Sequence, residues 1–199
     1  MEEAISFLVD KDIVFKKLYQ QYGNPFIPER PQGFVTLCKL ILEQQVSLDS
    51  AKACFTKIED FLGAISPETI RQCSEKDLKS CGVSRQKTSY LKILAKTVSE
   101  ELDLESLSTK TADDVRNELI KIKGIGHWTI DVYLMFALQS PDIIPLGDIA
   151  IVKTIKELFD VHTQEEMKML AERWKPYRTM ATLMLWHHYL EKRNRKPFI

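Results

Sequence analysis

Two short stretches of this chain combine residue types and spacings that could bind an anion or stabilise a cation. The first is Gly124-Ile-Gly126, where two glycines stand one residue apart. Because glycine tolerates positive φ and carries no Cβ, a phosphate could approach the backbone N–H groups at the start of a following helix, without help from a lysine. The second is Asp148, a carboxylate that could offset positive charge developing on a substrate.

Helical periodicity on both sides of the glycine pair predicts a helix, a tight hairpin and a second helix over residues 112–138. An ordinary glycine-containing turn between packed helices stays open as the alternative, because short glycine motifs often match by chance. The periodic apolar residues are Val115, Leu119 and Ile122 before the glycines, and Ile130, Leu134 and Ala137 after them.

Asp148 stands where the N-cap of a helix is expected. It follows Pro145 and Gly147, and it precedes an apolar helical series that runs from Ile149 to Leu158. Aspartate at such a position commonly accepts hydrogen bonds from the first-turn N–H groups. A capping aspartate without a chemical role is therefore the alternative interpretation.

The rest of the chain is also predicted to be helical, because no stretch keeps a period-two alternation long enough to form a strand. A first helix is expected from about Ile5, ending near Gly23, and Pro176 is expected to begin the last helix. Gly63 is an expected helix stop. The other expected helix starts are Ser47, Ser66, Ser74, Ser84, Thr111 and Thr163.

Composition limits the class of protein. With 199 residues, 44% of them hydrophobic, the chain is long enough for one compact unit, in which two lobes could share a cleft. It has no run of 18 apolar residues and starts with acidic residues, so neither a membrane span nor a signal peptide is expected. The four cysteines lack Cys-x-x-Cys spacing, which favours reduced thiols in an intracellular protein.

A formal net charge of zero argues against a protein that binds DNA through its overall charge. Residues 71–96 and 170–199 nevertheless each carry more lysine and arginine than acids. Since such side chains are usually only solvated, we expect a minority of them to contact phosphate.

The chain resembles the helix-hairpin-helix DNA glycosylases (the HhH-GPD superfamily), and within them the bacterial 3-methyladenine DNA glycosylase II type. The resemblance spans about residues 30–190, and the order of its motifs is more specific than any one of them. It implies an all-α fold of two lobes with a cleft between them. The motifs are LILEQQVSLDSA (40–51), IKGIGHWTIDVYLMFAL (122–138), LGDIAIVK (146–153) and ERWKPYRTMATLMLWHHY (172–189). The implied lobes are about 31–140, with the hairpin at 112–138, and about 1–30 plus 141–199.

The resemblance implies a monofunctional DNA glycosylase of base excision repair that hydrolyses the N-glycosidic bond of alkylated purines such as 3-methyladenine and 7-methylguanine. Asp148 matches the catalytic aspartate, which stabilises positive charge on the sugar of a nucleotide flipped out of duplex DNA. Gln45 matches the side chain that wedges into the duplex, where many relatives have a larger apolar residue. A polar surface residue at a helix end is the alternative for Gln45.

Three aromatic residues are implied to form the pocket for the base: Trp128, Trp186 and neighbouring Tyr133. An electron-rich pocket favours a base made cationic by alkylation, through cation–π attraction of about 0.5–2 kcal/mol. Bifunctional relatives carry a lysine at the position of Trp128, where it forms a Schiff base with the sugar. We therefore expect no lyase activity, with water as the nucleophile. Helical core aromatics are the alternative for all three residues.

The resemblance also assigns the remaining contacts and cofactors. No cofactor is expected to be required, and an iron–sulfur cluster is expected to be absent because no cysteine follows Cys81. The expected partner is duplex DNA with damaged bases, bound by a monomer, and the N-terminal β-rich domain of many relatives is expected to be missing. The DNA-binding residues are implied to be Gln45, Gly124, Ile125, Gly126, His127 and Thr129. The backbone carbonyls of Ile120, Ile122 and Ile125 are implied to hold a monovalent cation.

Two other classes of protein stay open. One is a DNA-binding module of the same fold that recognises damage without catalysis, although Asp148 together with two tryptophans disfavours it. The other is a helical interaction protein in which Asp148 is only a cap. Binding of duplex DNA through the glycine hairpin would separate the last class from the others.

Overall fold

The computed structural model describes residues 1–195, which divide into two compact units. The hairpin unit is Arg30–Leu138, and the terminal unit combines Met1–Glu29 with the segment from Gln139 onward. These boundaries lie within two residues of the predicted lobes. Lys196, part of the predicted basic segment 170–199, lies outside the described residues. The predicted cleft between lobes stays a prediction.

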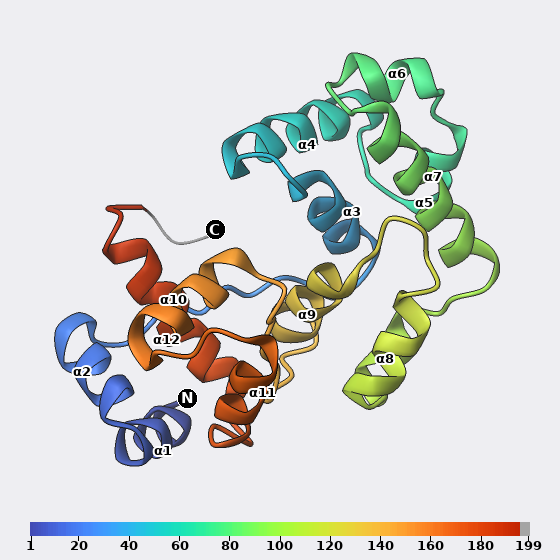
Figure 1. The fold of residues 1–199 in the computed structure, drawn as a ribbon. Helices are drawn as coiled ribbons and strands as arrows, with labels where there is room; N and C mark the ends of the chain where they lie inside the picture. Colours follow the sequence, from blue (N-terminus) through green and yellow to red (C-terminus); the bar gives the residue numbers. More distant parts are fainter. Residues whose placement is uncertain (196–199) are drawn as a thin grey trace. The chain divides into compact units, whose positions relative to one another are not determined.

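In the hairpin unit, the central element is α3, which packs against α4, α7 and α9 (Figure 1). It can be central because it is apolar on nearly all sides, and its Leu37, Leu40 and Ile41 are fully buried. The elements are α3 (Phe34–Glu43), α4 (Leu48–Leu62), α5 (Pro67–Gln72), α6 (Glu75–Ser80), α7 (Arg85–Glu100), the 3₁₀ helix η1 (Glu105–Thr109), α8 (Ala112–Leu119) and α9 (His127–Phe136).

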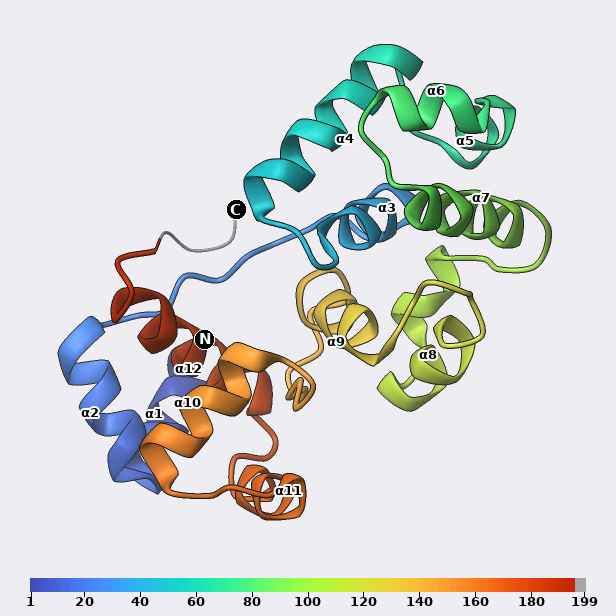
Figure 2. The same ribbon diagram turned by 45° about the horizontal axis from the view of Figure 1, so that its top comes forward.

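In the terminal unit, α12 packs against α1, α2 and α10 (Figure 2). An aromatic cluster fills part of this core, where the ring of Trp174 contacts the rings of Phe15 and Phe159 at 5.2 and 5.3 Å. The elements are α1 (Glu2–Lys11), α2 (Ile13–Tyr22), α10 (Ile149–Phe159), α11 (Gln164–Glu172) and α12 (Arg178–Glu191).

The all-α prediction is confirmed, since residues 1–195 contain no strand. Local capping chemistry explains where most helices begin, because a serine or threonine side chain accepts a hydrogen bond from a first-turn N–H. Gly63 ends α4 with φ +75°, as predicted. The predicted caps that accept such a hydrogen bond are Ser47, Ser66, Ser74, Ser84, Thr111 and Thr163.

Among the described helices, none is long and apolar enough to cross a membrane.

Two predicted helix boundaries are wrong. The first predicted helix is broken at Asp12, whose extended backbone (φ −142°, ψ 124°) ends α1 and whose side chain caps α2 by accepting from Val14 N–H. Asp12 is buried and paired with Arg173 at 3.3 Å, so a tertiary ion pair favours the break. Pro176 lies in the turn before the last helix, which begins at Arg178.

Candidate functional site

The carboxylate of Asp148 caps α10 in the terminal unit. Its Oδ1 accepts hydrogen bonds from the backbone N–H groups of Ala150 at 2.8 Å and Ile151 at 3.0 Å. The N-cap prediction is therefore confirmed. The cap also fixes the carboxylate at the N-terminus of α10.

Trp186 donates a third hydrogen bond to the same oxygen. The indole Nε1–H of Trp186, on α12, lies 3.2 Å from Asp148 Oδ1, and the side chain is 5% exposed. A carboxylate that only capped a helix would need no such side-chain donor. Three donors on one oxygen restrict the rotation of the carboxylate, so Asp148 is a cap and also a rigidly oriented negative group.

The segment that leads into Asp148 is bound to α12, the helix that carries Trp186. Arg178 at the start of α12 forms a bidentate ion pair with Asp142, with N–O distances of 2.7 and 2.9 Å. One turn further on, Thr182 Oγ1 donates to the carbonyl of Ile143 at 3.2 Å. These bonds join the segment before Asp148 to the helix that carries Trp186. They therefore restrict the distance between the Asp148 carboxylate and the Trp186 indole.

In the hairpin unit, α8 and α9 are held together by an ion pair. Arg116 on α8 donates to the carboxylate of Asp131 on α9, which is 6% exposed. Burial raises the pKa of the Asp131 carboxyl, while the Arg116 guanidinium lowers it. Removing Arg116 alone would leave a buried, unpaired carboxylate, so this pair fixes the hairpin.

Gly124 is required by the fold of the hairpin. Its φ is +99°, a conformation that side chains disfavour. A Cβ at this position would also lie 2.3 Å from Cγ of Tyr90, which is far inside van der Waals contact. Both observations explain a glycine at position 124 without a ligand.

Gly126 differs, because its backbone does not use the positive φ that glycine allows. Its φ is −105° and ψ is 175°, which any residue adopts, and an added Cβ would meet no atom within 4 Å. Gly126 is the N-cap of α9, yet no side chain caps this helix. The fold does not require a glycine at position 126, but an anion approaching the first turn of α9 would benefit from the absent Cβ.

Two predicted site residues on α9 are buried in the core of the hairpin unit. The ring of Tyr133 is fully buried, and its hydroxyl accepts a hydrogen bond from Gly33 N–H at 3.0 Å. Burial raises the pKa of the Tyr133 hydroxyl. The side chain of Thr129 is 2% exposed. Tyr133 therefore lies in the core of this unit, and its place in a base pocket stays a prediction. Thr129 could offer an approaching anion only its backbone N–H.

The other predicted hairpin residues lie at or near the start of α9. His127 is exposed, Trp128 is half-buried, and the side chain of Ile125 is buried, so Ile125 can contribute only backbone groups. Trp128 and Trp186 belong to different units, and their pairing in one base pocket stays a prediction.

The turn between α3 and α4 presents the predicted wedge to solvent. Gln45 is exposed and has φ +57°, a strained conformation for a residue with a Cβ, and the side chain of Val46 is 47% exposed. The neighbouring Gln44 turns the other way. Its Nε2 donates to Gly124 O at 2.9 Å and to Thr129 Oγ1 at 3.1 Å. Gln44 was not among the predicted site residues, although its neighbour Gln45 placed this turn in the predicted DNA interface.

The carbonyls of Ile120, Ile122 and Ile125 lie in the turn between α8 and α9. One of them, Ile122 O, already accepts a hydrogen bond from Ile125 N–H at 3.0 Å. A carbonyl oxygen has two lone pairs, so this bond leaves room for a second interaction. Within residues 1–195, no group of three or more His, Cys, Asp or Glu side chains could hold a metal ion. Hard oxygen donors of this kind fit a simple cation rather than a transition metal.

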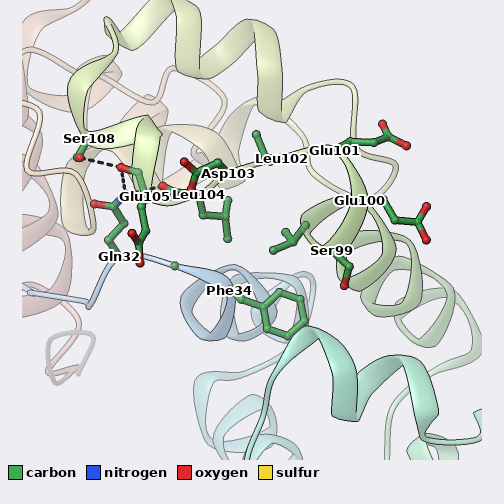
Figure 3. Close-up of a pocket in the computed structure, with 12 residues that line it drawn as sticks. Gln32, Phe34, Ser99, Glu100, Glu101, Leu102, Asp103, Leu104, Glu105 and Ser108 are labelled. Carbon is green, nitrogen blue, oxygen red and sulfur yellow. Dashed lines mark hydrogen bonds between the residues drawn. The ribbon is translucent and has the colours of Figure 1, made fainter.

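A cavity of about 890 Å³ in the hairpin unit has the wrong charge for DNA (Figure 3). It lies between the start of α3 and the segment that connects α7 to η1. Because carboxylates repel phosphate, this cavity is not a candidate for the DNA backbone. Its acidic lining residues are Glu100, Glu101, Asp103 and Glu105.

Solved structures similar to this chain share its fold over nearly the full length. The DNA-3-methyladenine glycosidase of Bacillus halodurans has a TM-score of 0.84 and 28% identity, with 96% of this chain and 91% of that chain covered. The 3-methyladenine DNA glycosylase of Schizosaccharomyces pombe, in complex with abasic DNA, has a TM-score of 0.82 and 26% identity, covering 92% and 95% of the two chains.

Sequence comparisons point the same way. The protein YfjP of Bacillus subtilis, named provisionally as a DNA-3-methyladenine glycosylase, is 33% identical over 165 residues, or 75% of this chain. This chain spans 56% of the length of YfjP and 59% and 57% of two further curated relatives. The model of the HhH-GPD superfamily base excision DNA repair proteins matches residues 38–179. The chain therefore belongs to the HhH-GPD superfamily of base excision DNA repair proteins.

Proposed function

We propose that this protein is a monofunctional DNA glycosylase that removes alkylated purines from duplex DNA. The observation that carries the proposal is Asp148, whose Oδ1 accepts from two backbone N–H groups and from the indole of Trp186. The names of the relatives support the substrate class, since they are 3-methyladenine glycosylases and glycosidases.

In the proposed reaction, Asp148 acts on the sugar of a flipped nucleotide. The bond between C1′ and the base nitrogen breaks, and its electron pair leaves with the base, so positive charge develops on the sugar. The fixed carboxylate stabilises this charge without reorganising at the moment of reaction. Water then adds to C1′ and loses a proton, leaving an abasic site. A base alkylated at a ring nitrogen is cationic and leaves as a neutral molecule, so no general acid is needed.

The hairpin would hold the DNA rather than react with it. A phosphate placed at the first turn of α9 meets backbone N–H groups at the positive end of the helix, where Gly126 offers no Cβ. Exposed Gln45 would fill the gap left by the flipped base. The carbonyls of Ile120, Ile122 and Ile125 would hold a monovalent cation, which would add positive charge beside the same phosphate. No other cofactor is part of the proposal.

Trp128 underlies the proposed absence of lyase activity. It occupies the position at which bifunctional relatives place a lysine, and an indole cannot condense with the C1′ aldehyde. Its half-buried ring is also suited to stack on a cationic base. Borohydride should therefore trap no covalent adduct between the protein and DNA. Efficient trapping would contradict this part of the proposal and direct attention to Lys121, Lys123 or Lys153.

The function is tested by incubating the protein with randomly methylated duplex DNA and identifying the released bases by chromatography. We expect release of 3-methyladenine, 7-methylguanine or both, and an intact abasic strand. Binding of the damaged DNA without release of any base would instead support a non-catalytic module that recognises damage. Absence of both binding and release would leave Asp148 as a helix cap.

A further inference from the structure

The side chain of Gln44 connects two elements of the hairpin unit that are far apart in sequence. It ends α3, and its amide donates to Gly124 O at 2.9 Å and to Thr129 Oγ1 at 3.1 Å. Figure 2 shows the turn after α3 beside the start of α9. A single amide group therefore joins the α3–α4 turn to the α8–α9 hairpin.

The two acceptors of Gln44 lie on either side of Gly126 in the sequence. Gly124 belongs to the turn before the N-cap, and Thr129 belongs to the first turn of α9. The amide therefore spans the place where a phosphate would meet the helix N-terminus. Tyr90 also packs closely against this turn, because a Cβ at Gly124 would lie 2.3 Å from its Cγ.

The other end of the connection is the exposed tip formed by Gln45 and Val46. Gln45 keeps φ +57°, a left-handed conformation that a residue with a Cβ disfavours, so its neighbours must hold it in place. On one side Gln44 is bound to the hairpin, and on the other Ser47 caps α4 by accepting from Ser50 N–H at 3.2 Å. The position of the tip is therefore tied to the position of the hairpin.

We propose that Gln44 is a positioning residue that couples the α8–α9 hairpin, where a phosphate would bind, to the tip formed by Gln45 and Val46, which would enter the DNA duplex. DNA held by the hairpin would then meet the tip in a fixed position. The proposal rests on the proposed function, since it takes both elements to contact DNA. Gln44 itself is half-buried and directs its amide into the protein, so it acts through Gly124 and Gln45 rather than on the substrate.

Loss of Gln44 should leave the unit folded. The end of α3 has a second attachment, because Lys87 Nζ donates to Leu42 O at 2.7 Å. The hairpin has its own ion pair between Arg116 and Asp131. Coupling can therefore be removed while both elements remain in place.

The test is a double-mutant cycle on binding to duplex DNA that contains an abasic site, with Gly126→Ala for the hairpin and Gln45→Ala for the tip. In the parent protein we expect the two changes to be non-additive by at least about fivefold in Kd. In a Gln44→Leu background we expect them to be additive within about twofold. Gln44→Asn, with an amide one methylene too short to bridge, should behave like Gln44→Leu and serves if the leucine variant does not fold.

Gln32→Leu is the matched control. Gln32 also donates from Nε2 to backbone carbonyls of the hairpin unit, those of Leu104 and Glu105, but it lies at the acidic cavity. Its loss should leave the non-additivity unchanged. Additivity in the parent, or unchanged non-additivity in both Gln44 variants, would overturn the coupling. Base release by the parent is measured separately, so a binding-competent protein that releases no base refutes the proposed function and leaves the cycle readable.

Discussion

The N-termini of α9 and α10 differ, because a side chain caps α10 and none caps α9. Asp148 closes α10 with its own carboxylate, which accepts from two of the N–H groups there. Gly126 begins α9 with no side-chain cap and no Cβ. The same backbone dipole therefore orients an internal negative charge in one case and is offered to an external anion in the other.

The residue at the cap, rather than the helix itself, decides the chemistry of each N-terminus. At α10 the fixed carboxylate suits developing positive charge, and at α9 the open turn suits a phosphate. We therefore expect substitutions at the α10 cap to affect the rate of base release, and substitutions at the α9 cap to affect DNA binding.

The largest effect is expected for Asp148→Asn. The amide keeps an oxygen that can accept from the first-turn N–H groups of α10, but it loses the negative charge. Single-turnover base release from methylated duplex DNA should slow by about a thousandfold, since an electrostatic group aimed at the transition state is worth about 10²–10³ in rate. Binding to abasic DNA should stay within about threefold of the parent. Release within about tenfold of the parent would reduce Asp148 to a cap.

Trp186→Phe removes one donor to Asp148 and keeps an aromatic ring. A hydrogen bond to a charged group contributes about 1.5–3 kcal/mol, so release should slow by roughly 10- to 100-fold with unchanged DNA binding. The matched control is Trp174→Phe in the same unit, because Trp174 Nε1 is buried without a hydrogen-bond partner. Trp174→Phe should lower the melting temperature and leave the rate alone. Equal rates for both variants would deny Trp186 a positioning role.

Gly126→Ala and Gly124→Ala sharpen the contrast inside the hairpin. Gly126→Ala should weaken binding to abasic DNA by about tenfold, because the new Cβ stands where the phosphate approaches. Its stability should change by less than about 1 kcal/mol, since poorer capping and a less flexible unfolded chain oppose each other. Gly124→Ala should instead lose more than about 2 kcal/mol, from positive φ and the contact with Tyr90.

Chemical denaturation and fluorescence anisotropy measure the two quantities for each glycine variant. Equal losses of stability and binding in Gly126→Ala would make position 126 a structural turn like position 124.

The smallest effect is expected for Tyr133→Phe, which distinguishes a core residue from a pocket wall. Loss of the hydroxyl leaves Gly33 N–H without its partner and should cost about 1 kcal/mol of stability. The ratio of 3-methyladenine to 7-methylguanine released should not change. A changed ratio would return Tyr133 to the base pocket.

Local patterns were sufficient to predict most of the fold. Caps such as Ser84 and Asp148 act over two or three residues, so their hydrogen bonds can be inferred from neighbouring sequence alone. The break at Asp12 could not, because the ion pair with Arg173 joins distant segments.

The site was less predictable for the same reason. The contact between Trp186 and Asp148 joins residues 38 positions apart, and the contact between Gln44 and Gly124 joins residues 80 apart. The burial of Tyr133 could not be predicted because α9 is buried on nearly all sides, so no polar face shows which residues point into the core.

We propose that the α9 cap serves DNA binding and the α10 cap serves base release. Measuring base release at saturating protein tests this most directly. Single-turnover rates for Asp148→Asn and Gly126→Ala are compared with the parent at protein concentrations well above each measured Kd. We predict that Gly126→Ala recovers to within about threefold of the parent rate, while Asp148→Asn stays about a thousandfold slower. A Gly126→Ala rate that stays low at saturation, or an Asp148→Asn protein that recovers, would contradict the account.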